Sequence, residues 1–423
     1  MRSMFLHCIR SSLTCCLICL SLAPLAAQEN WPEFRGPTAD GHTGGPPLPM
    51  DLDQPSRVRW HISFSGKAWS SPVVWGDQIW LTNATEDGKK MSALCFDFHS
   101  GAVRREQVIH ENDSPEFCHP TNSYASPTPA IEEGRVYVHF GSYGTTCLDT
   151  KTGDVIWQRT DLKCDHFRGP GSSPILYDDK LFVAFDGADV QYVVALDKQT
   201  GETVWRTSRD IDYGTDNGDY KKAYGTGRVF EVDGRPILVY PSAVATIAYD
   251  VETGKQRWKV YHGGMNASAR PLMTPGGLLI LTNGMGKMVA VNPSGQGDIT
   301  DTHTVWMLAK GVTRKPSQLI VGDRLFMFSD KGIASAIDVT TGEIVWQERV
   351  GGAFSSSPIY DGEKIFAFSE SGEIHVIKPG DTFQPLAKIK MEDGFKASPA
   401  VVDGMLILRS FSSLYQFLST EDH

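Results

Sequence analysis

Two short groups of residues carry side chains that bind metals or form disulfides, Cys118-His119-Pro120 and Cys164-Asp165-His166. They lie nine residues before Pro127 and ten residues before Pro174, and each proline opens an apolar run. The matching positions predict equivalent loops of two neighbouring units, which would bring the groups close together. Two thiols and two imidazoles (Cys118, His119, Cys164 and His166) could complete a tetrahedral Zn²⁺ site, a Cys118–Cys164 disulfide could join the loops, or both thiols could stay free.

The longest polar insertion, residues 210–224, carries four aspartates and three tyrosines. Its carboxylates could ligate Ca²⁺, but their spacing is not that of an EF-hand loop, and a solvated loop is the simpler interpretation. Interleaved tyrosines also suit recognition, because each offers a large contact area with a polar tip. The candidate partner-binding residues are Tyr213, Asp216, Asp219, Tyr220 and Tyr224.

These loops must be positioned by an internal repeat, Asp-x-x-x-Gly-x-x-x-Trp, which occurs four times with the same spacing. The pattern favours a tight turn, since Asp bonds nearby backbone N–H groups and Gly adopts positive φ. The tryptophan can then pack between neighbouring sheets, so these residues are predicted to be structural. The four copies are Asp149, Gly153 and Trp157; Asp197, Gly201 and Trp205; Asp250, Gly254 and Trp258; and Asp338, Gly342 and Trp346.

A second phrase, two small residues followed by proline, precedes an apolar run at Pro72, Pro127, Pro174, Pro358 and Pro399. Looser versions near Gly227, Pro271 and Pro316 bring the number of units to eight. In residues 173–208, the β-branched and aromatic runs between turn residues predict four strands. Four-stranded units of this length favour an all-β fold, an eight-bladed β-propeller of antiparallel blades.

The ends of the repeat predict how the ring closes. The eighth unit, from Ala397, lacks its Trp strand, whereas residues 57–60 (Arg-Val-Arg-Trp) form a strand without a unit. Pairing these segments would leave no open sheet edge. The predicted organisation is a signal peptide at 1–27, an extended arm outside the ring at 28–56, the propeller at 57–418 and a tail at 419–423. Cys95 and Cys147 lie inside apolar strands and are predicted to be buried.

Residues near the second phrase should approach the axis of such a ring. Seven of them could surround one mouth of the channel: Trp69, Tyr124, Arg168, Arg270, Arg314, Phe354 and Lys396. A cationic, aromatic rim suits an anionic small ligand. The alternative is that these residues pack between blades or are solvated charges.

The first residues and the charge balance limit the compartment and the partners. Arg2 and Arg10, the apolar run 13–22 and Ala26-Ala27 have the pattern of a secretory signal peptide, which predicts a periplasmic or extracellular protein without a transmembrane segment. Cys15, Cys16 and Cys19 lie within that run, so no lipid anchor is expected. The net charge of −10 makes nucleic acid an unlikely partner. No catalytic triad, nucleotide-binding glycine loop or metalloprotease motif occurs in a supporting context.

The repeated turns, such as Asp149-Thr-Lys-Thr-Gly153-Asp-Val-Ile-Trp157, resemble the pyrroloquinoline-quinone-like (PQQ-like) repeat family of eight-bladed propellers. The segment Trp31-Pro-Glu-Phe-Arg-Gly-Pro37 resembles the start of secreted planctomycete members. One branch of the family implies a dehydrogenase that uses quinone and Ca²⁺ and clamps the quinone with adjacent cysteines. The only adjacent pair here, Cys15-Cys16, falls in the predicted leader.

The other branch implies a non-enzymatic scaffold like the lipoprotein of the outer-membrane β-barrel assembly machinery, which presents loops to a protein partner in the cell envelope. Chain length and the missing cysteine clamp favour this scaffold without a cofactor. The alternative is a quinone (PQQ)-binding oxidoreductase with Ca²⁺.

Overall fold

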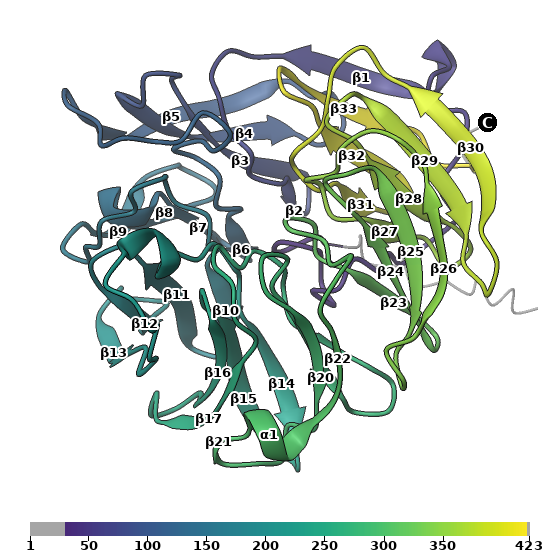
Figure 1. The fold of residues 1–423 in the computed structure, drawn as a ribbon. Coiled ribbons are helices and arrows are strands. Elements are labelled where there is room, and N and C mark those ends of the chain that lie inside the picture. Colours follow the sequence, from purple (N-terminus) through teal and green to yellow (C-terminus); the bar gives the residue numbers. More distant parts are fainter. Residues whose placement is uncertain (1–29, 421–423) are drawn as a thin grey trace, which may run out of the picture.

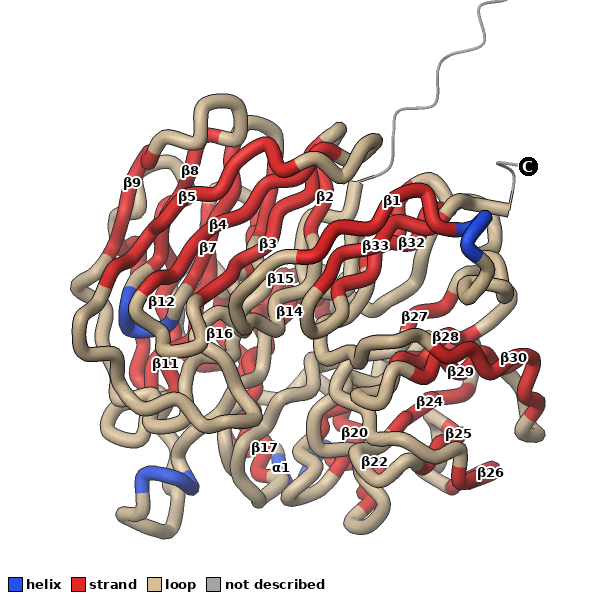
Figure 2. Tube along the Cα trace, turned by 90° about the horizontal axis from the view of Figure 1, so that it is seen from above, coloured by secondary structure: helices blue, strands red, loops and turns tan. Residues whose placement is uncertain are grey.

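The computed structural model describes residues 30–420, which form eight antiparallel sheets arranged around a central axis (Figure 1). Strands account for nearly all regular structure, and helical residues are confined to short segments (Figure 2). These segments are η1 (Pro55–Arg57), η2 (Gly141–Tyr143), η3 (Gly218–Tyr220) and α1 (Thr300–His303). The all-β, eight-bladed propeller predicted from the repeats is therefore confirmed.

Each sheet is called a blade and is numbered in chain order, with its strands given from the axis outward. Blade 1 contains β2 (Val73–Trp75), β3 (Gln78–Ala84), β4 (Lys90–Asp97) and β5 (Val103–Glu111), and blade 2 contains β6 (Ala130–Glu132), β7 (Arg135–His139), β8 (Thr145–Asp149) and β9 (Val155–Arg159). Blade 3 contains β10 (Ile175–Tyr177), β11 (Lys180–Asp186), β12 (Gln191–Asp197) and β13 (Thr203–Ser208), and blade 4 contains β14 (Arg228–Val232), β15 (Arg235–Pro241), β16 (Ala245–Asp250) and β17 (Gln256–Tyr261).

The second half of the ring follows the same order. Blade 5 contains β18 (Leu272–Met273), β19 (Leu279–Thr282), β20 (Met288–Val291) and β22 (Thr304–Leu308), and blade 6 contains β23 (Leu319–Val321), β24 (Arg324–Phe328), β25 (Ile333–Asp338) and β26 (Ile344–Arg349). Blade 7 contains β27 (Ile359–Tyr360), β28 (Ile365–Phe368), β29 (Glu373–Lys378) and β30 (Gln384–Lys390). Blade 8 contains β31 (Ala400–Val402), β32 (Met405–Arg409), β33 (Ser413–Phe417) and β1 (Val58–Ser63).

The ring closes through β1, which pairs antiparallel with β33 from the other end of the sequence. Trp60 lies opposite Gln416, and Ile62 lies opposite Leu414. Blade 8 therefore joins the first and last strands of the ring and covers an edge of β33 that would otherwise be open. This confirms the predicted closure by the N-terminal strand.

The repeated turns connect each blade to its neighbour. In blade 3, Asp197 Oδ1 accepts backbone N–H groups from Gln199 and Thr200, and Gly201 adopts a φ of 75°. The ring of Trp157 from blade 2 lies over Gly201, where an added Cβ would come within 2.6 Å of it, and Trp157 Nε1 donates to Lys198 O at 3.0 Å. Only glycine leaves room for this contact.

The repeat glycines of blades 4 and 6 make the same contact. Gly254 adopts a φ of 67°, and a Cβ added there would lie 2.5 Å from the ring of Trp205 in blade 3. Gly342 adopts a φ of 75°, and a Cβ added there would lie 2.6 Å from the ring of Trp306 in blade 5. Each glycine thus meets the tryptophan of the preceding blade and not the tryptophan of its own repeat, a pairing that the spacing within one repeat could not reveal.

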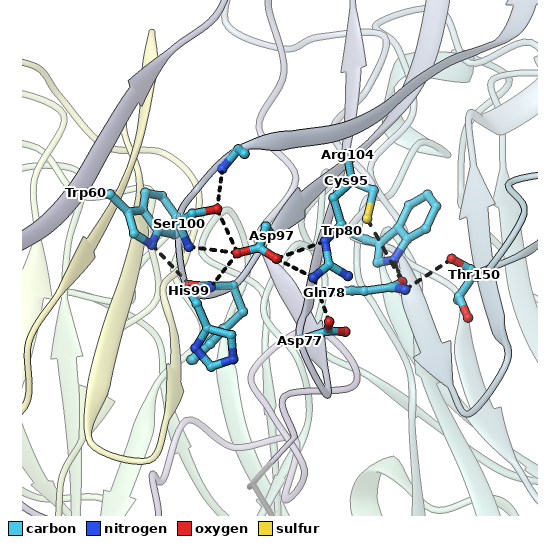
Figure 3. Close-up of polar contacts among 12 residues, drawn as sticks. Trp60, Asp77, Gln78, Trp80, Cys95, Asp97, His99, Ser100, Arg104 and Thr150 are labelled. Atoms are coloured by element: carbon cyan, nitrogen blue, oxygen red, sulfur yellow. Dashed lines mark hydrogen bonds and ion pairs between the residues drawn. The ribbon is translucent and has the colours of Figure 1, made fainter.

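Indole hydrogen bonds accompany this inter-blade contact around the ring. The Trp60, Trp205, Trp306 and Trp346 indoles donate to Phe98 O, Val251 O, Val339 O and Gly380 O. Figure 3 shows the contact at blade 1, where Trp60 meets the turn around Asp97. Where the sequence has Arg105 instead of tryptophan, the arginine packs on Gly153 and donates to Lys151 O at 3.0 Å.

Trp258 departs from this pattern. An insertion adds a short strand, β21 (Gly297–Asp298), which pairs parallel with β17 at Trp258. The Trp258 Nε1 atom has no hydrogen-bond partner within residues 30–420. Blades 4 and 5 are therefore joined by this added strand in place of the indole hydrogen bond.

Trp205→Ala is expected to lower the free energy of unfolding by about 3–5 kcal/mol, because the ring leaves a cavity between two blades and its hydrogen bond is lost. Trp205 is 8% exposed, whereas its neighbour Val204 is 48% exposed. Val204→Ala is the control and should change the free energy by less than about 0.5 kcal/mol. Urea unfolding followed by circular dichroism measures both, and equal midpoints for the two variants would contradict the inter-blade role of Trp205.

The described part of the predicted N-terminal arm, residues 30–56, does not lie outside the ring as expected. Trp31, Arg35, Leu48 and Leu52 are each 1% exposed. Trp31 pairs with Val74 of β2 through two backbone hydrogen bonds of 2.9 and 2.8 Å. The abundance of Pro and Gly indicates only that the arm lacks regular secondary structure. The position of the arm is set by its aromatic and aliphatic side chains, which are buried against the ring.

Candidate functional site

The innermost residues of the blades form a ring of hydrogen bonds around the axis. Seven blades place Ser or Thr directly before the residue that leads into the inner strand: Ser71, Thr128, Ser173, Thr226, Ser317, Ser357 and Ser398. We call these residues the inner hydroxyl ring. The hydroxyl of each accepts a hydrogen bond of 2.9–3.0 Å from the backbone N–H of the equivalent residue in the preceding blade. The ring closes where the hydroxyl of Ser71 in blade 1 accepts from the backbone N–H of Ser398 in blade 8.

Arg270 occupies the equivalent position in blade 5, where a hydroxyl is missing. Its guanidinium donates to Gly227 O at 3.0 Å, to Phe34 O and to Glu33 Oε1 at 3.2 Å. Arg35 follows in the arm and donates to Gln318 O at 2.7 Å. Arg270 therefore holds the arm across the axis at the single break in the ring.

A pocket with a volume of about 380 Å³ lies on the axis beside the inner hydroxyl ring. We call it the axial pocket. Phe34 from the arm contributes to its wall, and the loops that lead into the inner strands form the rest, among them those with Trp69, Asn122 and Tyr224. The loops surround the mouth, and the arm lies across the other end of the channel, so the pocket is accessible from the loop face.

The axial pocket is cationic in a protein whose net charge is −10. Its lining includes Arg168, Arg314, Lys315 and Lys396, and no Asp or Glu among the described residues. The carboxylates that pair with these four cations are not themselves among the lining residues. Asp219 binds Arg168 with two bonds of 2.8 Å, Glu370 lies 3.1 Å from Lys315 and 3.9 Å from Lys396, and Asp330 lies 3.9 Å from Arg314.

The structure places four of the seven predicted rim residues at the axial pocket and the other three away from it. Trp69, Arg168, Arg314 and Lys396 line the axial pocket. Tyr124 turns away, because its hydroxyl donates to Glu116 O at 2.7 Å. Phe354 is fully buried against Phe328, and Arg270 binds the arm.

The predicted partner-binding loop splits into two environments. Asp219 is paired with Arg168, Tyr224 lines the axial pocket, and the Tyr213 hydroxyl lies 3.4 Å from Ser242 Oγ. Asp216 and Tyr220 remain exposed. The loop thus lies on the same face as the loops with Cys118 and Cys164, and only part of it is available to a partner.

Exposed aromatic residues gather on this loop face. Phe117 is 60% exposed, Phe167 is 41% exposed, and their ring centres lie 6.5 Å apart. They come from the loops that precede blades 2 and 3, and Tyr220 in the next loop is 45% exposed. We call Phe117, Phe167 and Tyr220 the aromatic patch. Sequence analysis missed both phenylalanines, although each stands next to a cysteine or histidine group that it singled out.

Of the three alternatives for Cys118 and Cys164, the disulfide and the shared metal site are corrected by the structure, and free thiols are observed. Cys118 and Cys164 are both free, and no group of three or more His, Cys, Asp or Glu within residues 30–420 is arranged to hold a metal ion. The Cys118 thiol faces Arg168 O at 3.8 Å, whereas Cys164 turns inward to the Ser142 hydroxyl and His166. His119 bonds Thr121 instead of facing His166. The loops do lie together, but their irregular backbone sends the side chains in different directions.

Desolvation raises the pKa of both thiols. It raises the pKa of Cys164 to about 12 and that of Cys118 to about 11. Cys95 and Cys147 are buried, and burial raises the pKa of each to about 12. None of these four cysteines is among the residues that line the axial pocket.

Several lining residues were missed by sequence analysis. They are Phe34, Lys315 and six of the seven members of the inner hydroxyl ring. A Ser or Thr recurs at the entrance of the inner strands, and this recurrence is the sequence signal for the ring. In blade 2 the small-small-proline phrase ends at Pro127, whereas the structure shows that Thr128-Pro129 is equivalent to the Ser-Pro pairs of the other blades. Nothing local marks Phe34 or Lys315 as axial.

Comparison with known proteins places these features in a family. No curated protein matches the sequence. Among solved structures, BamB from Moraxella catarrhalis is 14% identical with a TM-score of 0.59, over 85% of this chain and 98% of that one. A europium-containing methanol dehydrogenase is 11% identical with a TM-score of 0.70, over 92% and 98%.

The quinohemoprotein alcohol dehydrogenase from Comamonas testosteroni is 12% identical with a TM-score of 0.67, over 92% of this chain and 80% of that one. At these identities the likeness establishes the fold alone. The family model described as outer membrane protein assembly factor BamB matches residues 50–163, 115–209 and 160–381. Because these matches extend over more than half of the chain, the protein belongs to this PQQ-like repeat family of BamB.

Proposed function

We propose that this protein is a non-enzymatic scaffold of the cell envelope, which binds a protein partner through its loop face and takes part in the assembly of envelope or outer-membrane proteins. The observation that carries the proposal is the aromatic patch. Exposed aromatic side chains on a rigid loop face are typical of the residues that dominate binding at protein interfaces.

The geometry of the loops supports a preformed surface. The Phe117 loop is tied to the Phe167 loop by a backbone bond from His119 N to Arg168 O and by a side-chain bond from Asn122 to Arg168 O at 2.9 Å. Arg168 in turn binds Asp219 in the next loop. Three consecutive loops are thereby connected, so little ordering entropy is lost when a partner binds.

The family description, an outer membrane assembly factor, supports a place outside the cytoplasm. The predicted signal peptide points the same way, although it lies outside the described residues. Within residues 30–420 no helix is long and apolar enough to cross a membrane. We propose that the protein works in the periplasm or outside the cell, which the family description supports.

The alternative, a quinone-dependent dehydrogenase, does not fit the residues that are present. Ca²⁺ takes six to eight oxygen ligands, usually including carboxylates. The described lining of the axial pocket has no carboxylate, and four cations stand where a calcium site would need anions. The half-buried Cys118 and the buried Cys164 are not adjacent in the sequence, and the described residues contain no adjacent pair of cysteines that could form the clamp.

The test compares two double variants in the native envelope. Phe117→Ser with Phe167→Ser removes both phenylalanines of the aromatic patch. Val204→Ser with Ile344→Ser changes two comparably exposed apolar residues, 48% and 43% exposed, on outer strands. After cross-linking and purification, we expect a defined partner band with the native and control proteins and its loss with the patch variant. Equal recovery of that band by both double variants would overturn the assignment of the loop face.

A further inference from the structure

We propose that the axial pocket binds a small organic anion that carries hydroxyl groups, a sugar acid, sugar phosphate or hydroxy acid, directly and without a metal ion. This goes beyond the proposed scaffold function, since it assigns a ligand to the channel instead of a partner to the loops. The argument rests on the charge, the free donors, the shape and the closed end of the pocket.

The charge balance favours an anion. Four cations line the pocket, and the three carboxylates that face them from behind leave one positive charge in excess. Two of the contacts, Arg314 to Asp330 and Lys396 to Glu370, are 3.9 Å long and therefore weak. An oxyanion in the pocket would complete the coordination of these groups with charge-assisted hydrogen bonds.

Lys396 is the most constrained of these cations. Its side chain is 13% exposed, and its Nζ lies 4.6 Å from the centre of the Trp69 ring. The ammonium has three N–H donors, and one of them bonds Thr121 O at 3.2 Å. No other hydrogen bond of Lys396 is found among the described residues, so two donors remain for a ligand in the pocket that Lys396 lines.

Hydroxyl groups supply a second set of donors. Six members of the inner hydroxyl ring line the pocket, namely Ser71, Thr128, Ser173, Thr226, Ser357 and Ser398. Each oxygen already accepts a backbone N–H, and within residues 30–420 none of the six donates its own proton to a protein acceptor. Their O–H groups can therefore donate to a ligand.

Two further polar atoms of lining residues have no partner. Trp69 Nε1 is a buried donor and Asn266 Oδ1 is a buried acceptor, and neither forms a hydrogen bond within the described residues. Unpaired buried polar atoms are costly, and both of these atoms are shielded from the open space of the pocket, so a turn of either side chain toward the pocket would let it pair with a bound ligand or water. An acceptor beside many donors favours a ligand that has hydroxyl groups as well as an oxyanion.

The shape of the pocket sets the size of the ligand. A volume of about 380 Å³ is near the lower end of small-molecule sites, which span roughly 300–1,000 Å³. Phe34 and the arm limit depth, and Trp69 and Tyr224 provide apolar surface in the wall. A monomeric sugar derivative or hydroxy acid is of this size, whereas a polymer chain cannot pass through the closed channel.

The experiment titrates the purified mature protein with glucose 6-phosphate, glucuronate and citrate, with glucose as the neutral probe, in EDTA and at matched ionic strength. Isothermal calorimetry and the midpoint of thermal unfolding are both measured. We expect at least one anion to bind and raise the midpoint, glucose to have no effect, and affinity to fall as salt screens the charges. Glucose 6-phosphate tests whether the ligand carries a phosphate group, and glucuronate and citrate test whether it carries a carboxylate.

The test variant combines Lys396→Met with Arg314→Gln, and Lys255→Gln, an exposed lysine in a turn of blade 4, is the control. Removing two cations should weaken binding by about tenfold or more, and the control should bind as the native protein does. Circular dichroism verifies that each variant is folded. Phe117→Ser, which leaves Phe167 and its contact with the Arg168 guanidinium in place, should keep the anion affinity, which separates this proposal from the scaffold.

Three results would overturn the proposal. The first is that no anion binds more tightly than glucose, the second is that the double cation variant binds as well as the native protein, and the third is that binding requires added Ca²⁺. Each of these leaves the partner experiment unaffected, because that experiment measures the recovery of a protein partner and depends on the aromatic patch, not on the cations of the axial pocket.

Discussion

A chain shortened to begin at residue 64 is expected to aggregate instead of folding into a ring. It lacks β1, so the edge of β33 loses its backbone partners and the indole of Trp60 no longer covers Gly101. An open strand edge next to uncovered apolar surface promotes pairing between chains. Sedimentation velocity and thermal unfolding of the purified protein measure the effect.

A chain that begins at residue 54 provides the matched control. It loses most of the arm and keeps β1, so we expect a folded ring with a lower unfolding midpoint, because the buried Trp31, Arg35, Leu48 and Leu52 are removed. It should also lose the affinity for anions, since Phe34 no longer limits the axial pocket. If the shorter chain stays soluble and melts at the same temperature as this control, closure by β1 is not what stabilises the ring.

Asp186→Ala is expected to reduce the free energy of unfolding by about 3–5 kcal/mol, because it leaves the Arg209 guanidinium buried without a counter-charge. Asp186 and Arg209 side chains are 2% and 1% exposed and are joined by bonds of 2.9 and 2.7 Å. Burial alone would lower the pKa of Arg209, but the Asp186 carboxylate outweighs it and the pKa is raised. Urea unfolding measures the loss.

The pair also connects blades 3 and 4, since Arg209 donates to Tyr240 O and Pro241 O at 3.1 Å. Asp179→Ala is the control, because Asp179 is 70% exposed and its pairing with Lys180 contributes at most about 1 kcal/mol. Replacing both members of the buried pair, Asp186→Leu with Arg209→Met, should cost less than Asp186→Ala alone. A loss for Asp186→Ala no greater than that for Asp179→Ala would contradict this account.

The sequence by itself determined the fold, because the repeat acts locally. In each turn the Asp side chain caps backbone N–H groups within three residues, and Gly adopts the positive φ that the turn requires, as at Asp197 and Gly201. Strand patterns between such turns then fix the number of blades. The missing last strand and the spare Trp60 strand were also visible, so closure of the ring could be predicted before any tertiary contact was known.

Only the tertiary structure decided the candidate site, because its residues meet across the axis from distant parts of the chain. Phe34 and Arg270 lie more than 200 residues apart, and no local pattern indicates that Arg270 replaces a hydroxyl and holds the arm. Irregular loops also fix side-chain direction only through their packing, which is why Cys118 and Cys164 turned apart while Phe117 and Phe167 came together. Strand and turn periodicity carries no information on these directions, whereas contacts between blades set them.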